Sequence, residues 1–199
     1  MKGRFITNVT PQDKIVAVNN RLGNSNIRNQ QGTTRVLFDS IELDGRQEFR
    51  FFENSGSKQY PFTNVGAEGN RLNVGDTFVV QKIYFGVLST DADTGVVVGF
   101  DPFPTFGWTE FMKGELSFQI ANSQVIKQLP IEWSYDASFN PTGENQRDLA
   151  LGTFTDIVIP PLLEYVLSYR TISYTAIEDT RLVCFIEGTA GIIAPQTTF

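Results

Sequence analysis

From residue 36 onward, short runs of apolar and aromatic residues alternate with turn-forming pairs, a pattern typical of β-strands. Turn signals such as Asp44-Gly45, Gly75-Asp76 and Asp91–Gly95 separate several of the runs. The runs predict strands at residues 36–43, 48–53, 71–74, 77–88, 96–100, 115–120, 125–133, 154–159, 163–173 and 181–187, with 191–194 as a further candidate. Roughly eight to ten strands without a convincing helix predict an all-β sandwich or barrel.

The segment FTDIVIPPLLEYVLSYRTISY, residues 154–174, is open to two interpretations. A helix starting at Pro161 groups four side chains on one face: Leu162, Tyr165, Val166 and Tyr169. A strand groups a different set: Leu163, Tyr165, Leu167 and Tyr169. The many aromatic and branched residues favour the strand. Because proline cannot donate to a β-ladder, Pro160-Pro161 is expected to end one strand and begin the next at a corner. The apolar flanks predict an edge that the same chain or another subunit covers.

The first 35 residues differ in character from the rest of the chain. Residues 19–35, NNRLGNSNIRNQQGTTR, are rich in Asn, Gln and Gly, which predicts an extended arm or a long loop. Since no similar linker follows and 199 residues fit one domain, we expect a polar N-terminal arm at 1–35 and a single β-sandwich domain at 36–199.

Charge is distributed unevenly between these two parts. Residues 1–35 carry six Lys or Arg and one Asp, or +5, whereas the remainder carries ten basic and 21 acidic residues, or −11, which together give −6. A basic arm on an acidic body predicts contact with nucleic acid or with an acidic neighbouring subunit, or else a solvated tail. The candidate contact residues are Arg21, Arg28 and Arg35. Without interleaved aromatics or a tight basic cluster, only weak, non-specific nucleic-acid contact is expected.

Composition also narrows the chemistry that the chain can perform. The sequence has no histidine, which removes Ser-His-Asp and Cys-His catalytic systems and histidine metal sites. The single cysteine, Cys184 in RLVCFIEG, is expected to be a buried small hydrophobe, and synthesis in a reducing cytoplasm is expected. No apolar run reaches about 18 residues, so no membrane span is predicted. We therefore expect no enzyme, no cofactor and no metal site.

Three acidic motifs could carry chemistry or bind a metal in spite of this expectation. Asp93-Thr94-Gly95 occurs in aspartic proteases, but their mechanism needs two such aspartates and only one copy is present, so a hairpin turn is favoured. Asp91–Gly95 also matches the start of a calcium loop, whose later positions then fail, which leaves only a loose loop site. The glycosidase-like pairs Glu132 with Asp136 and Glu110 with Glu115 are expected by chance among 22 acids. A hydrolase that uses carboxylates, Asp93 among them, is the weakest alternative function.

The segment FDPFPTFGWTEF, residues 100–111, concentrates five aromatic side chains in twelve residues. Exposed aromatics stack on sugar rings in carbohydrate-binding modules, but aromatics are also enriched in subunit interfaces. Phe outnumbers Trp here, which favours a core or an interface over a sugar platform. The predicted subunit-interface residues are Phe103, Phe106, Trp108, Phe111, Pro160 and Pro161.

Two stretches, FRFFENSGSKQYPFTNV…NRLNVGDTFVVQKIYF (49–85) and IVIPPLLEYVLSYRT…RLVCFIEGT (157–189), resemble bacteriophage virion proteins of the single jelly-roll capsid or capsid-associated type. The shared elements are a strand ending in a proline pair, a following strand of alternating aromatics, and a late strand ending in Glu-Gly. They cover about a third of the chain.

The resemblance implies a jelly-roll-like antiparallel sandwich of two facing four-stranded sheets with Greek-key connections. It further implies a virion protein that assembles with itself and with other virion proteins into or onto an icosahedral capsid, and an arm that clasps neighbours or faces the genome. The arm is only weakly basic, a departure that argues against direct genome binding. The alternative from another class is a carbohydrate- or receptor-binding sandwich of a phage tail or fibre.

Overall fold

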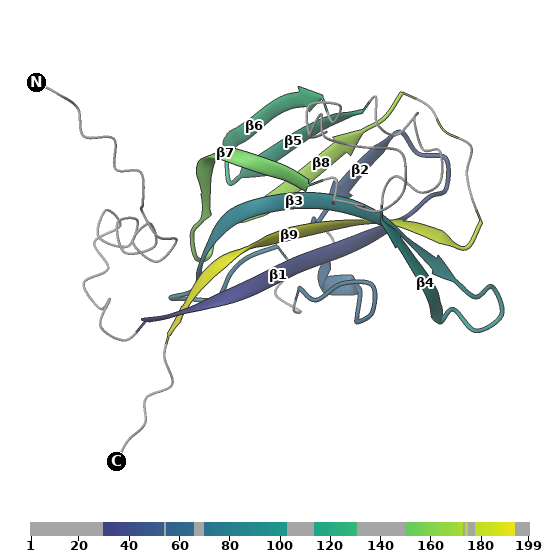
Figure 1. Cartoon of the computed structure of the whole chain (residues 1–199), viewed down its shortest axis with the longest axis horizontal. Helices are drawn as coiled ribbons and strands as arrows, with labels where there is room; N and C mark the ends of the chain where they lie inside the picture. The colour runs from purple at the N-terminus through teal and green to yellow at the C-terminus, as the bar shows by residue number, and fades with distance from the viewer. Residues whose placement is uncertain are drawn as a thin grey trace, which may run out of the picture.

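Two antiparallel sheets lie face to face in the computed structural model, which describes residues 30–53, 55–65, 70–102, 114–130, 150–172, 174 and 178–193 (Figure 1). The predicted all-β sandwich is confirmed. The described elements are β1 (Gln30–Glu42), β2 (Glu48–Phe51), η2 (a 3-10 turn, Ser55–Ser57), β3 (Thr77–Thr90), β4 (Val97–Pro102), β5 (Glu115–Ile120), β6 (Ser123–Pro130), β7 (Ala150–Ile159), β8 (Tyr165–Arg170) and β9 (Thr180–Ile193). Within these residues no helix is long and apolar enough to cross a membrane.

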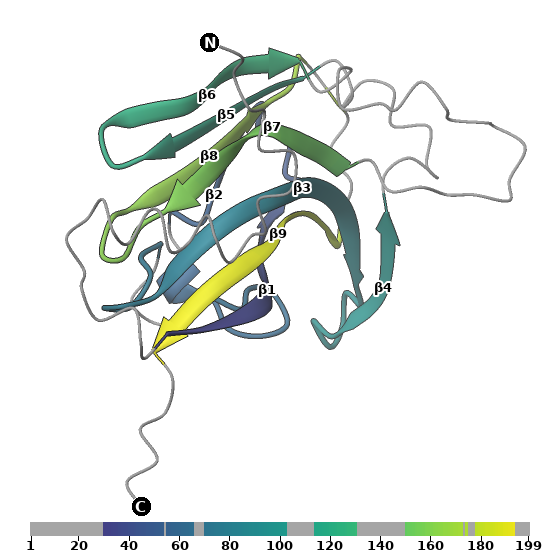
Figure 2. The same ribbon diagram turned by 60° about the vertical axis from the view of Figure 1, so that its left-hand side comes forward.

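The strands pair in a nested order. One sheet runs β1-β9-β3, and β3 then pairs with β7 along its first half and with β4 along its second. The other sheet runs β2-β8-β5-β6. With β4 set aside, the first strand pairs with the last (β1 with β9), the next inward pair is β2 with β8, then β3 with β7, and finally β5 with β6. The eight strands thus behave as one long antiparallel ribbon wound into two layers, and Figure 2 shows β4 curving away from them.

The core fills the space between the sheets and is rich in aromatic side chains. Strand β8 alternates buried and less buried residues, which places Tyr165, Leu167 and Tyr169 in the core and confirms a strand with these three on one face. It is shorter than the predicted 163–173, and Leu163, predicted on the same face, lies before the strand and is exposed. Rings from different strands meet there, with centroids 6.1 Å apart for Phe49 and Tyr169 and 5.3 Å apart for Phe52 and Tyr165. Alternation along a strand and aromatic packing across the layers therefore give the same inward face.

A β-bulge in β3 keeps that long strand in register with the core. The pairing with both β7 and β9 shifts between Val80 and Lys82. Because one extra residue reverses which side chains point inward, Phe78 and Val80 face the core before the bulge, and Ile83 and Val87 face it afterwards. The bulge allows a 14-residue strand to bend over the core without turning its apolar face outward.

The structure moves several predicted boundaries. Strand β1 begins at Gln30, so residues 30–35, assigned from the sequence to the arm, belong to the sandwich, and Arg35 pairs with Gly188. Residues 181–187 and 191–194 are not separate, since β9 runs unbroken to Ile193 between two partner strands. Residues 71–74 form only isolated bridges, at Arg71 and Leu72. In each case the backbone partners available in the tertiary structure override local propensity.

One buried hydroxyl in the described part of the chain has no hydrogen-bond partner, that of Tyr165. Burial raises its pKa above the usual value, because the charged form is desolvated. We expect Tyr165→Phe to leave the free energy of unfolding unchanged or to raise it by up to about 1 kcal/mol, since only a desolvated group is lost. Urea unfolding followed by fluorescence measures this free energy.

Tyr169→Phe on the same strand is the control. It removes a hydroxyl that hydrogen-bonds Thr171, and it should lower the free energy of unfolding by about 1 kcal/mol. Equal losses in both variants would contradict the prediction.

Candidate functional site

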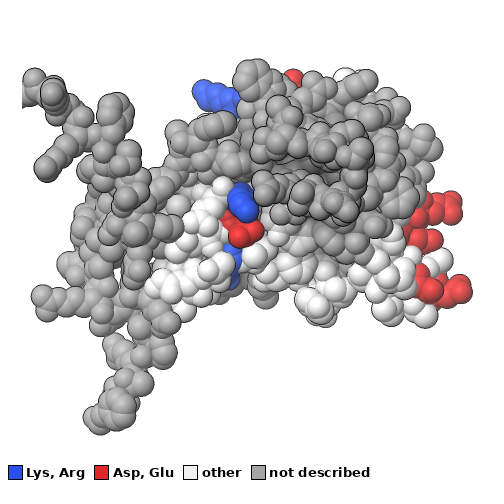
Figure 3. Space-filling model, in the orientation of Figure 1, with Lys and Arg blue, Asp and Glu red and all other residues white. Residues whose placement is uncertain are grey.

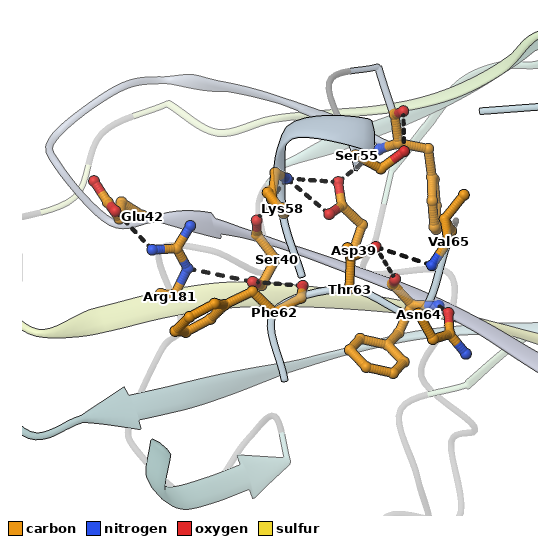
Figure 4. A network of polar contacts seen from close by, with 12 residues as sticks. Asp39, Ser40, Glu42, Ser55, Lys58, Phe62, Thr63, Asn64, Val65 and Arg181 are labelled. Carbon is orange, nitrogen blue, oxygen red and sulfur yellow. Dashed lines mark hydrogen bonds and ion pairs between the residues drawn. The ribbon is translucent and has the colours of Figure 1, made fainter. Parts of the chain in front are cut away.

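Residues 58–65, which follow η2, cover part of the edge of β1. Among the described strands β1 pairs only with β9, on one side, so the backbone groups of alternate residues point away from the ladder. Asn64 satisfies several of them: its Oδ1 accepts a hydrogen bond from Phe38 N at 2.8 Å, and its Nδ2 donates to Val36 O at 2.5 Å. Thr63 Oγ1 donates to Phe38 O at 2.9 Å (Figure 4). These side-chain hydrogen bonds, together with one β-bridge between Asp39 and Thr63, satisfy backbone groups that a further strand would otherwise pair.

A buried ion pair holds this segment to β1. Asp39 has the inward parity of Leu37 and Ile41, and its side chain is 0% exposed. Lys58 Nζ lies 2.7 and 2.9 Å from its two carboxylate oxygens and donates also to Ser40 O at 2.8 Å. Phe52 N donates to Asp39 Oδ2 at 2.8 Å. Because both carboxylate oxygens are engaged with the chain's own donors, we interpret the pair as an anchor between β1 and the 52–65 segment (Figure 4).

Beside this network lies an open pocket of about 340 Å³. It is lined by Ser40, Ile41, Glu42, Arg46, Glu48, Arg50, Glu53, Lys58 and Arg181. Its cations already have partners in the chain: Arg181 Nη1 lies 2.6 Å from Glu42 Oε1, and Arg50 Nη2 lies 2.9 Å from Glu53 Oε1. The Arg181 guanidinium also sits 4.7 Å from the centre of the Phe62 ring. The pocket is therefore a mixed-charge surface of internal ion pairs.

Charge differs between the two ends of the sandwich. One end brings together the β1–β2 turn, the β3–β4 turn and the start of β9, tied by Leu43 N to Thr180 O at 3.0 Å and Thr90 N to Asp179 O at 2.7 Å. This end is acidic, with side chains of Asp44, Asp91, Asp93, Glu178 and Asp179, and acidic groups gather at the right-hand end in Figure 3. Arg46 hydrogen-bonds Asp44 and holds the pKa of that carboxyl at about 2. Asp44 therefore keeps its negative charge to a lower pH than an ordinary aspartate does.

The opposite end carries the β7–β8 corner. Strand β7 ends at Ile159 in one sheet and β8 begins at Tyr165 in the other, so Pro160 and Pro161 stand where the chain crosses between layers. The prediction that the proline pair ends one strand at a corner is confirmed, whereas the next strand begins only at Tyr165 and not at the prolines. Both prolines are half-buried, and Pro161 forms a bridge with Leu72. The exposed apolar side chains are those that follow, Leu162 and Leu163.

The other predicted site residues are only partly described. Arg35, expected to lie on the arm, lies in β1, and its Nη1 is 3.6 Å from Asp76 Oδ2. The remaining predicted contact residues lie outside the described residues, as do the carboxylates of the glycosidase-like pairs other than Glu115: Arg21, Arg28, Phe103, Phe106, Trp108, Phe111, Glu110, Glu132 and Asp136. The sugar-platform alternative rests on this undescribed aromatic segment.

The acidic motif at 91–95 is a hairpin turn, as its favoured interpretation predicted. Asp91 Oδ1 accepts hydrogen bonds from Thr94 N and Thr94 Oγ1, both at 2.8 Å, and from Asp93 N at 3.1 Å. The bonds from Thr94 lower the pKa of Asp91. Asp93 itself is exposed on the turn. In the part of the chain that the structure describes, no group of three or more Asp, Glu, Cys or His is arranged to hold a metal ion.

Cys184 lies in the core and is fully buried, which confirms the prediction of a small hydrophobe. Burial raises the pKa of its thiol well above the ordinary value. A thiol in this state is a poor nucleophile, because the thiolate is the reactive form.

Reasoning from the sequence missed the Asp39–Lys58 pair, although a signal was present. In VLFDSIEL, residues 36–43, Asp39 falls on the same alternating face as Leu37, Ile41 and Leu43, where an acid must be paired or buried at a penalty. Its partner, 19 residues away, carries no comparable signal. Comparisons of the chain with protein-family models, curated proteins and solved structures give no match in any of the three.

Proposed function

We propose that the chain is a virion structural protein, a non-catalytic subunit that assembles with copies of itself and with other virion proteins into or onto an icosahedral phage capsid. The nested strand pairing carries this proposal. With β4 set aside, each of the two facing sheets has four strands, the first strand pairs with the last, and each successive pair follows inward. This order of pairing supports a jelly roll. Jelly rolls build viral capsids and also occur in lectins and cupins, so the step from fold to shell subunit is an analogy.

Two properties of the described residues support a structural role over a binding one. The polar network around Asp39 and Lys58 is engaged in holding the chain's own segments together. Large apolar side chains are exposed at both ends of the sandwich, among them Val74, Leu162, Val98 and Ile172. Exposed apolar residues of this kind suit contacts with neighbouring subunits.

The arm supplies the first test. Residues 1–29 precede β1 and carry five Lys or Arg against Asp13, or +4, whereas the body is acidic. We expect a chain lacking residues 1–29 to keep the circular dichroism spectrum and unfolding midpoint of the full chain, but to assemble poorly. Light scattering and electron micrographs of the same fractions measure assembly. Arg21→Gln/Arg28→Gln is the length-matched control for charge, and its defect should be smaller and should depend on salt.

Normal assembly of the shortened chain would contradict the role of the arm. A full-length chain that stays a 22.3 kDa monomer, and whose tryptophan fluorescence responds to added glycans, would instead favour a carbohydrate-binding module.

A further inference from the structure

Val74, Leu162 and Leu163 are exposed apolar residues on two segments that a hydrogen bond from Leu162 N to Leu72 O joins, and they are called here the corner patch. The segments meet at the β7–β8 end of the sandwich, the left-hand end in Figure 1. The exposed fractions of the three residues are 70%, 54% and 42%. The backbone beneath them is held by hydrogen bonds, from Leu162 N to Leu72 O and from Tyr165 N to Asn70 O, both 3.0 Å. The patch therefore stands on hydrogen-bonded backbone that is anchored to the core.

Leu162 is held in an unfavourable backbone conformation. Its φ is 63°, in the left-handed region that a large side chain rarely adopts and that glycine adopts freely. In the isolated chain, burial of the Leu162 side chain offsets little of this conformational cost, because about half of the residue is exposed. Backbone strain of this kind clusters at functional sites such as ligand clamps and switch regions. Strain and exposure thus coincide at one leucine.

We infer that the corner patch is an interface between two copies of this chain, packed patch against patch about a two-fold axis. The inference rests on the proposed self-assembly and names one surface that carries it. Beside the patch, Arg71 and Glu164 are both exposed and form an ion pair within the chain. A two-fold axis brings the same surface of both copies together, so that Arg71 of one copy can face Glu164 of the other.

Charge selects this end over the other. At the patch end each described cation is matched by an acid, Arg71 by Glu164 and Arg35 by Asp76. At the opposite end acids outnumber cations, and two such ends would repel. A contact between identical surfaces is therefore favoured where the charges of the described residues balance.

The positions of the chain ends agree with this contact. Gln30 pairs with Ile193, and Thr77 pairs with Gly191, so the chain enters β1 and leaves β9 beside the 70–76 segment that carries Val74. Twenty-nine residues precede Gln30, and a fully extended stretch of that length spans about 95 Å. Each arm therefore starts at the proposed contact, within reach of the second copy.

The test uses full-length chains with substitutions at Leu162, and sedimentation equilibrium as the measure of self-association. Leu162→Gly removes the patch side chain and relieves the backbone strain. We expect at least a tenfold weaker association with no loss of the urea midpoint, a combination that simple destabilisation would not produce. Leu162→Asp should weaken association at least as much. Val98→Asp is the control, because Val98 is 67% exposed on β4, away from the patch, and should associate as the unchanged chain does.

Charge exchange tests the two-fold geometry. Glu164→Arg alone should weaken association, and Arg71→Glu/Glu164→Arg should restore most of it. Unchanged association in both Leu162 variants would overturn the inference and leave the proposed assembly function standing. A full chain that never associates would overturn both. Equal weakening by Val98→Asp would overturn the assignment to the corner patch.

Discussion

Gly188→Ala should lower the free energy of unfolding by about 3 kcal/mol, the upper part of the range for overpacking a well-packed site. Gly188 lies in β9, a central strand that has β1 on one side and β3 on the other. A Cβ at this position would lie 2.0 Å from Val79 O, 2.9 Å from Val79 C and 3.0 Å from Phe78 Cζ. The nearest atoms belong to the backbone of β3, which cannot move without breaking its ladder with β9 and β7. Glycine is needed here because two backbones approach each other closely.

Gly99→Ala is the matched control for this substitution. Gly99 lies on β4, and nothing stands within 4 Å of the Cβ that alanine would add. We expect its effect to stay below about 0.5 kcal/mol, as is usual for surface positions. Urea unfolding of both variants gives the comparison directly. Equal stability of the two would contradict the close approach of β9 to β3.

Lys58→Met should cost about 3 kcal/mol, the lower end of the range for breaking a buried ion pair by removing one partner. The substitution keeps the length and apolar stem of the side chain but removes the charge. Asp39 would then remain buried with Phe52 N as its remaining donor, and the 52–65 segment would lose its hold on Ser40 O. The loss arises from an uncompensated buried carboxylate, so it should change little between low and high salt.

Two further variants test the cause of this loss. Arg50→Met breaks an exposed pair between Arg50, in β2, and Glu53, three residues further along the chain, and should cost at most about 0.5 kcal/mol. Asp39→Asn/Lys58→Met removes both charges and should recover part of the stability lost in Lys58→Met, which a double-mutant cycle measures as a coupling energy. If Lys58→Met were no more destabilising than Arg50→Met, the anchoring role of the buried pair would be wrong.

Strands and turns were predictable because their signals are local. Strand β5 runs from Glu115 to Ile120 as its alternation predicted, and the Gly75 and Gly95 turns both place glycine at positive φ. The same alternation identified the core face of β8. The corner at Pro160-Pro161 was predictable because proline lacks the N–H that a continuing strand needs. The apolar flank of that corner was expected to be covered, and the structure divides it into buried Tyr165 and exposed Leu162 and Leu163.

Long-range partners were not predictable from local signals. Residues 30–35 are polar and read as an arm, yet they form a strand because the second half of β9 offers them a ladder. The bulge beside Val80 leaves no mark in composition, since it arises from fitting β3 to two neighbours at once. The alternation around Asp39 indicated a buried acid, but only the folded chain brings Lys58 next to it.

The sequence by itself determined the class of fold, the main strands and turns, and the short supply of catalytic side chains, because alternation, turn chemistry and composition act over a few residues. The tertiary structure decided the nested pairing of β1 with β9 and β2 with β8, the ion pair that closes the β1 edge, and the exposure of Leu162. Those features depend on which distant segments meet, and a wound ribbon of strands brings together residues more than 100 positions apart.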